Sequence, residues 1–150
     1  MTLAGPLKAT LFVSTTGTDA DFIVKLIDVL PNNAPDNSPR GPDVKMGGYQ
    51  MLIRGEPMRA KYRNSWSKPT ALTPNRVQKV EFTLPDVVHT FKKGHKIMVQ
   101  VHSSWFPVID RNPQKFMNIM QADASDFQKA THRLYMSGSS ASSLEISVLP

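Results

Sequence analysis

The residues with the most unusual chemistry lie in one segment of this sequence, residues 103–112, which directly follows a predicted strand. The segment combines two aromatic residues, a proline and a triplet of an acid, a base and an amide: Trp105, Phe106, Pro107, Asp110, Arg111 and Asn112. Loops are normally polar, so exposed aromatic rings in one indicate a surface that packs on something. Asp110 and Arg111 have the charges for a bond that would hold the loop. The residues alone leave open whether the aromatic pair contacts a partner or only caps its own fold.

No pattern of residues for nucleophilic catalysis competes with this segment. A nucleophile elbow needs small residues on both sides of its serine, and Ser139 follows Gly138 but is itself followed by Ser140 and Ala141. The pair Gly47 and Gly48 stands alone, without the further glycines and lysine of a phosphate-binding loop. We therefore predict no catalytic residue and no cofactor for these 150 residues.

Metal ligation is not predicted either. The chain has no cysteine, and its histidines show neither helical pair spacing nor thiolate partners: His89, His95, His102 and His132. Asp19 and Asp21 carry oxygen atoms that calcium accepts, but aspartates in turns more commonly bond the local backbone. The pattern favours turn chemistry and leaves calcium binding open.

The net charge of +6, from 18 basic and 12 acidic residues, lies within the range that solubility alone explains. The densest basic stretch contains Arg54, Arg59, Lys61 and Arg63, and its cations alternate with uncharged residues. This pattern is typical of a solvated strand face, so we predict no nucleic-acid partner. No apolar run approaches the roughly 20 residues that cross a bilayer, and no secretion signal is recognised, so we predict no membrane contact.

The elements that position the loop are predicted to be strands. Twelve prolines and eight glycines separate short stretches of alternating or β-branched residues. We expect about eight strands, at residues 7–13, 22–29, 49–54, 58–63, 77–84, 96–103, 131–136 and 144–149. In the strand that precedes the loop, Ile97, Val99 and Val101 are expected on one half-buried face. Residues 31–42 are expected to form an irregular, proline-rich loop.

Helical periodicity is weak, and its best candidate, residues 115–120, is too short for more than a turn or two. Short strands joined by long, uneven loops suit a two-layer antiparallel sandwich of jelly-roll or Greek-key type. The sequence therefore predicts one all-β domain over residues 1–150, a β-sandwich with long loops and little helix.

Several ordered blocks of this sequence resemble one family. The blocks are Gly5-Pro6, Thr18-Asp19-Ala20-Asp21-Phe22-Ile23-Val24-Lys25-Leu26-Ile27-Asp28-Val29, Met58-Arg59-Ala60-Lys61-Tyr62-Arg63, Gly94-His95, Ser103-Ser104-Trp105-Phe106-Pro107, Asp110-Arg111-Asn112 and Ser143-Leu144-Glu145-Ile146-Ser147-Val148-Leu149-Pro150. Together they resemble the C-terminal non-catalytic domain of X-Pro dipeptidyl-peptidases and cocaine-esterase-like (CocE/NonD) serine hydrolases. That family includes α-amino acid ester hydrolases and cephalosporin acylases. The resemblance extends over nearly the whole chain.

The resemblance implies a jelly-roll sandwich similar to galactose-binding domains, which follows an α/β-hydrolase domain with a Ser-Asp-His triad. The triad would act through an acyl-enzyme on a serine outside these residues. The partner implied is that α/β-hydrolase domain, in the same longer chain. One or two initial strands of the family domain have no counterpart before Gly5 and Pro6, so an unpaired sheet edge and a homo-oligomer are conceivable.

By resemblance, loop 103–112 faces the hydrolase domain near the mouth of its active site. Trp105 and Phe106 would line the substrate pocket there, and Arg111 would anchor the loop. The compartment of the longer protein stays open, with the bacterial periplasm or the outside of the cell as candidates. An alternative function is a free-standing carbohydrate-binding sandwich that stacks sugar rings on Trp66, Trp105 or a tyrosine, because a fold does not determine a function.

Overall fold

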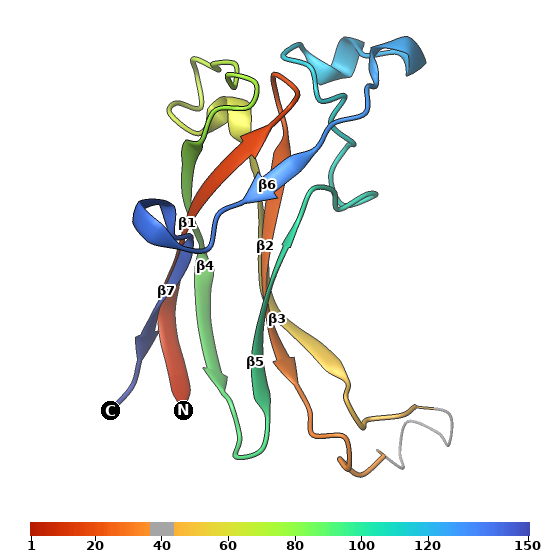
Figure 1. Ribbon diagram of the computed structural model, residues 1–150. Coiled ribbons are helices and arrows are strands. Elements are labelled where there is room, and N and C mark those ends of the chain that lie inside the picture. The colour runs from red at the N-terminus through yellow and green to blue at the C-terminus, as the bar shows by residue number, and fades with distance from the viewer. Residues whose placement is uncertain (37–43) are drawn as a thin grey trace.

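Two antiparallel sheets make up the computed structural model, which describes residues 1–36 and 44–150 (Figure 1). In one sheet, β1 (Thr2–Thr15) pairs on one side with β4 (Gln78–Thr90) and on the other with β6 (His132–Leu134) and β7 (Ser143–Val148). In the other sheet, β2 (Asp21–Val29) lies between β3 (Gln50–Arg59) and β5 (Lys96–His102). The prediction of an all-β sandwich is confirmed.

Strict alternation in β1 and β4 forms one half of the core. The two strands pair Leu7 with Leu84 and Leu11 with Val80, so their apolar residues share one face. Phe22, Val24 and Leu26 of β2 bury their side chains against that face from the other sheet. The predicted inward residues of β1 and β4 are all buried: Leu7, Ala9, Leu11, Val13, Val80, Phe82 and Leu84.

The number of predicted strands needs one correction, because residues 1–36 and 44–150 contain seven strands where about eight were expected. The segments 49–54 and 58–63 form one strand, β3, since Gly55 and Pro57 continue the pairing with β2 despite their breaking character. The chain then leaves the sheet in a three-residue 3-10 turn, η2 (Ala60–Tyr62). Part of the predicted loop 31–42 lies outside the described residues.

The predicted half-buried face of β5 is also corrected. Val101 contacts the core, but Ile97 and Val99 are 48% and 47% exposed. The reason is topological, because β5 is the outer strand of its sheet and pairs with β2 alone among the described strands. Val148, expected inward near the end of β7, is likewise 49% exposed.

Helix is confined to 3-10 turns in the described part of the chain. Besides η2 these are η3 (Ile119–Gln121), η4 (Ala124–Asp126) and η5 (Gly138–Ser140). The predicted helix at 115–120 is therefore replaced by a single turn that begins at its end. None of the described helical segments has the length and apolar character needed to cross a membrane.

Three connections gather at one end of the sandwich, residues 16–20, 60–77 and 103–131, and we call them the loop end (Figure 1). Backbone hydrogen bonds join them: the Thr18 amide donates to the Gln114 carbonyl at 3.1 Å, and the Leu72 amide donates to the Thr18 carbonyl at 2.8 Å. Both chain termini lie at the opposite end, where Leu3 of β1 pairs with Val148 of β7. The loop that carries the unusual residues is thus held by two other loops.

Candidate functional site

Loop 103–112 begins at the end of β5, and its first aromatic residue turns back onto the sheet. Trp105 is half-buried, and the ammonium of Lys25 lies 4.4 Å from the centre of its ring. The other side of the contact is Gly55, where an added Cβ would lie 2.8 Å from Cη2 of Trp105. Trp105 therefore packs on β2 and β3 of its own domain and fixes the root of the loop.

The far end of the loop is fastened by a buried polar network around Asp21. Asn112, 6% exposed, donates from Nδ2 to Oδ1 of Asp21 at 2.9 Å. Arg59 donates to both carboxylate oxygens of Asp21, from Nε at 2.9 Å and from Nη2 at 3.0 Å. The same Nη2 also donates to the backbone carbonyl of Asp110 at 3.0 Å. Because Asp21 is 1% exposed, this bidentate pair joins the loop to β2 and β3 inside the protein.

Asp19 supports the neighbouring turn in a different way. Its Oδ1 accepts the backbone amides of Ala20 at 2.9 Å and Lys61 at 3.0 Å, while its buried Oδ2 has no hydrogen-bond partner among the described residues. Burial is the main cause that raises the pKa of Asp19 above its ordinary value, and it outweighs the amides that lower this pKa. Asp19 thus bonds the local backbone, as expected of a turn aspartate.

The prediction that the basic stretch forms a solvated face is wrong, because its side chains make hydrogen bonds within the protein. Arg59 binds Asp21, and Lys61, 5% exposed, donates from Nζ to the Met117 carbonyl at 2.7 Å. Arg63 donates to three backbone carbonyls and to Oε1 of Gln78, at 2.9 to 3.1 Å. The alternation of charged and uncharged residues predicted that these cations are exposed to water. Instead, the loops at this end of the sandwich supply backbone carbonyls that accept hydrogen bonds from them. These three cations stabilise the loop end from within.

The middle of the loop is the part that faces outward. Phe106 and Val108 are 63% and 64% exposed, and the Phe106–Pro107 peptide bond is cis. The guanidinium carbon of Arg111 lies 5.6 Å from the ring centres of both Phe106 and Phe127. None of the ion pairs among the described residues includes Arg111, so the expected bond to Asp110 is replaced by stacking between two rings.

Two hollows lie beneath these exposed residues. One, of about 450 Å³, is lined by Pro57, Arg59, Tyr62, Trp66 and residues 107–110. The other, of about 310 Å³, is lined by Phe106, Asp110, Arg111, Ile119, Met120 and Phe127. They adjoin at Asp110, so one surface of mixed apolar and polar residues extends from Trp66 to Met120 across the loop end.

The predicted site residues therefore fall into two groups. Phe106, Pro107, Asp110 and Arg111 are exposed and line the hollows, whereas Trp105 and Asn112 bind inward and hold the loop in place. Sequence reasoning missed Met120 and Phe127, which lie in segments without periodicity. It also missed the Asp21–Arg59 pair, because Asp21 was expected just outside the strand 22–29 and no local pattern shows that this strand pairs with the one that contains Arg59.

Three of the four histidines, His89, His95 and His102, make side-chain hydrogen bonds, whereas the buried Nδ1 of His132 has no partner among the described residues. Buried Asp28 bonds two rings, Nε2 of His89 at 2.9 Å and Nδ1 of His95 at 2.8 Å. In the described ranges, 1–36 and 44–150, no serine hydroxyl is hydrogen-bonded to a histidine, and no three His, Asp or Glu residues are grouped to hold a metal. The arrangement offers recognition and packing chemistry.

Comparison with known proteins gives a consistent result. The family model described as the X-Pro dipeptidyl-peptidase C-terminal non-catalytic domain matches residues 1–145. A cocaine esterase from Rhodococcus sp. (strain MB1 Bresler) is 29% identical over 133 residues, which are 89% of this chain and 21% of that enzyme. The chain thus spans about a fifth of the length of this curated relative.

Solved structures agree in fold. An aminopeptidase from a marine-sediment Thaumarchaeota archaeon has a TM-score of 0.90 and 43% identity over 99% of this chain and 24% of its own. An α-amino acid ester hydrolase has a TM-score of 0.85 and 41% identity over 97% of this chain and 23% of its own. A CocE/NonD family hydrolase from Staphylococcus aureus, 20% identical, shares the fold with a TM-score of 0.61, over 97% of this chain and 28% of its own.

Proposed function

The chain belongs to the family of X-Pro dipeptidyl-peptidase C-terminal non-catalytic domains, and from this membership we propose that it serves as the accessory domain of a longer serine hydrolase. In this role its loop end packs against an α/β-hydrolase domain, and the exposed middle of loop 103–112 helps to shape the substrate pocket. The hydrolase domain supplies the nucleophile and the rest of the triad. The bonds cleaved are esters or peptide-like amides.

One observation carries the proposal: the loop end exposes apolar side chains that its own fold holds in position. Phe106, Val108 and Met120 are 63%, 64% and 81% exposed around two adjoining hollows. Exposed apolar patches on soluble domains mark interaction surfaces, because water-exposed apolar area is stabilised by burial against a partner. The Asp21 network and Trp105 hold both ends of the loop, so docking costs little ordering entropy.

The relatives support the chemistry of the partner. The aminopeptidase and the α-amino acid ester hydrolase are each about four times longer than the segment that this chain matches. Their names refer to cleavage of amide and ester bonds. A domain of this family that lies beside such a catalytic centre contributes shape and exclusion of water rather than a reacting group.

We expect Phe106→Ala to change substrate selection without unfolding the domain. The test uses a hybrid in which this chain replaces the segment that it matches in the α-amino acid ester hydrolase. The ratio of kcat/KM for amino acid esters with aromatic and with small side chains should shift by about tenfold, since a lost aromatic contact is worth roughly 1 kcal/mol or more. Urea unfolding of the 150-residue chain should change by less than about 0.5 kcal/mol, as for most exposed side chains.

Val88→Ala is the matched control, because Val88 is 80% exposed on β4 and lines neither hollow. Equal kinetics for the two variants and the parent hybrid would contradict pocket shaping. Loss of folded protein on Phe106→Ala would show instead that the ring is part of the core. A native gene product of 16.7 kDa, detected by an antibody against this chain, would contradict the role in a longer hydrolase.

A further inference from the structure

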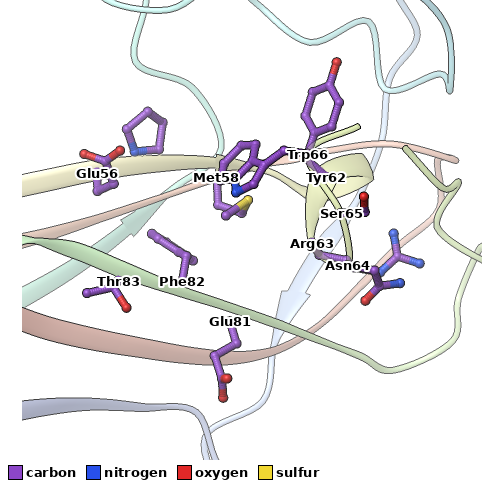
Figure 2. A pocket seen from close by; sticks show the side chains of 11 residues that line it. Glu56, Met58, Tyr62, Arg63, Asn64, Ser65, Trp66, Glu81, Phe82 and Thr83 are labelled. Atoms are coloured by element: carbon purple, nitrogen blue, oxygen red, sulfur yellow. The ribbon is translucent and has the colours of Figure 1, made fainter. Parts of the chain in front are cut away.

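A third hollow, of about 370 Å³, lies on the other side of Trp66 from the surface described above (Figure 2). It forms where β3 and β4, the outer strands of the two sheets, approach each other near the loop after η2. It shares Pro57, Tyr62 and Trp66 with the first hollow of that surface, whereas Met58, Phe82 and the polar residues of its rim line this hollow and neither of the other two. Its volume lies at the lower end of the range for small-molecule sites.

An aromatic platform forms one wall of this hollow. Trp66 is 72% exposed, and its ring stacks on that of Tyr62 with the centres 5.9 Å apart and the planes 27° from parallel. Tyr62 belongs to η2, which Arg63 and Lys61 hold to the domain by hydrogen bonds. The indole is therefore oriented before any ligand arrives, although most of its surface is in water.

The floor below the indole is apolar. Figure 2 shows the side chain of Met58 under Trp66 and Phe82 across the hollow from it. Both belong to the core, with 5% and 7% of their surface exposed, so the floor is rigid. A ligand that enters here meets an indole face above and a thioether and a phenyl ring below.

The rim carries polar groups that the protein does not use itself. No hydrogen bond to another described residue occupies the side chains of Glu56, Asn64 and Thr83, which line the hollow. Figure 2 places Glu56 and Thr83 on one side of Trp66 and Asn64 on the other. Together they offer acceptors and donors along an extended groove.

Three charged residues line this groove, Glu56, Arg63 and Glu81. Glu56 and Arg63 are one unit each of opposite sign, and the Arg63 guanidinium donates to carbonyls and to Gln78 within the protein. The carboxylate of Glu81 lies within 3.4 Å of the ammonium groups of both Lys8 and Lys79 and accepts a hydrogen bond from Thr10. With these two lysines, the charges in and beside the groove differ by a single unit, and a site with so little net charge favours a neutral ligand over an ammonium ion or a carboxylate.

From this geometry we propose that the hollow binds a short neutral oligosaccharide. One pyranose ring lies with its C–H face on the Trp66 indole, whose electron-rich face attracts polarised C–H groups. Hydroxyl groups of that ring and of its neighbours bond Glu56 and Thr83 on one side and Asn64 on the other. This function does not depend on the proposed role in a hydrolase.

The second tryptophan shows what this platform requires. Trp105 has the same indole, but Lys25 and Gly55 cover its ring, and it is half-buried on its own sheet. Tyr62 has its ring against Trp66. Of the aromatic residues that the sequence offered for stacking on a sugar, Trp66 alone combines high exposure with a fixed orientation and a polar rim.

The experiment is a nuclear magnetic resonance titration of the 150-residue chain, which has two tryptophans and hence two indole N–H signals. The probes are maltotriose, cellotriose and N,N′,N″-triacetylchitotriose, with choline as a cationic comparison. We expect at least one trisaccharide to shift the Trp66 signal saturably while the Trp105 signal stays in place. By calorimetry, Trp66→Ala should weaken that binding at least about tenfold, and Trp66→Phe should restore part of it.

Val88→Ala serves again as the control, and the unchanged Trp105 signal reports that each variant is folded. The proposal is overturned if none of the three trisaccharides shifts the Trp66 signal at millimolar concentration. A shift with choline alone would assign the hollow to a cation instead. Sugar binding that survives Trp66→Ala would place the site elsewhere. None of these results bears on kcat/KM in the hybrid enzyme, so the two proposals fail independently.

Discussion

Asp19 and Asp21 lie two residues apart and are both buried, yet their carboxylates meet opposite surroundings. Asp21 receives two N–H groups from Arg59 and one from Asn112, so its charge is compensated where it lies. Asp19 receives two backbone amides at one oxygen and none at the other among the described residues. One aspartate thus holds a loop through an ion pair, while the other holds a turn at an electrostatic cost.

Replacing Asp21 by Asn should destabilise the domain strongly, because Arg59 would keep its charge without a carboxylate. Removing one partner of a buried pair costs roughly 3–5 kcal/mol, and the 18% exposure of the Arg59 side chain lowers the expectation to about 2–4 kcal/mol. The free energy of unfolding in urea measures this loss. Glu81→Gln, which removes two solvent-exposed ion pairs with Lys8 and Lys79, should cost much less. Similar losses for the two variants would show that the Asp21 pair does not fasten the loop end.

The raised pKa of Asp19 predicts a pH dependence of definite sign. Folded Asp19 retains a proton above pH 3.8, the ordinary value at which the unfolded chain releases it. Its contribution to stability is therefore complete below pH 3.8 and is lost as pH rises through the raised folded value. The free energy of unfolding of the parent minus that of Asp19→Asn, both measured in urea between acidic and neutral pH, should fall as pH rises and then level off. A difference that rises with pH over that range would contradict the role of burial.

At the scale of the elements, the packing of one loop residue depends on a glycine in the middle of a strand. Gly55 pairs with Lys25, and Trp105 lies over both, in the space that a larger residue at position 55 would occupy. The close approach explains why a strand contains glycine at this point despite its entropic cost. Loop 103–112 and strand β3 are thereby matched to each other.

Gly55→Ala should displace the Trp105 ring. The new Cβ would lie 2.8 Å from Cη2 and 3.1 Å from Cζ3, so the indole must shift, at a cost of about 1–3 kcal/mol for overpacking. The expected result is a moved Trp105 indole N–H signal and a lower free energy of unfolding. In a Trp105→Ala background the same substitution should cost much less. An equal cost in both backgrounds would mean that the glycine serves the backbone rather than the ring.

Local patterns predicted the strands well where apolar and polar side chains alternate. They predicted the strands poorly where a glycine or a proline suggested that a strand ends. Leu7 to Val13 and Val80 to Leu84 follow strict alternation and are buried as expected. Gly55 and Pro57 suggested a break that pairing with β2 overrides. Ile97 and Val99 alternate like core residues, but their exposure depends on which strands flank β5, and no local pattern contains that information.

The sequence indicated the exposed residues of the candidate site but not the buried contacts that hold the loop in place. Phe106 and Arg111 were conspicuous because aromatic and charged residues are unusual together in a loop. The inner half depends on pairs far apart in the chain, such as Asp21 with Asn112, which are 91 residues apart. Composition could not distinguish Arg59 or Lys61 from solvated cations, since burial of a cation depends on acceptors that tertiary folding brings to it.

At the scale of the whole molecule, exposed apolar side chains occur at the loop end and also on the strands and near the termini, as at Val88, Ile97 and Leu149. The loop end exposes Trp66, Phe106, Val108 and Met120, whereas the interior between the sheets forms one continuous core. In the accessory role proposed above, the strands would supply stability and the loops at one end would supply the docking surface. The family membership and the likeness to hydrolases several times longer support that proposal.

The position of the two termini sets a length requirement on anything joined to this domain. Both termini lie at the end opposite the loops, and β1 extends between the two ends with 14 residues (Figure 1). At about 3.3 Å per residue these span about 46 Å. A catalytic domain tethered to residue 1 therefore reaches the loop end only if it is itself that long or if its tether has roughly 14 extended residues. Fusions that join a smaller domain through a shorter tether would hold the two surfaces apart, however well they fit.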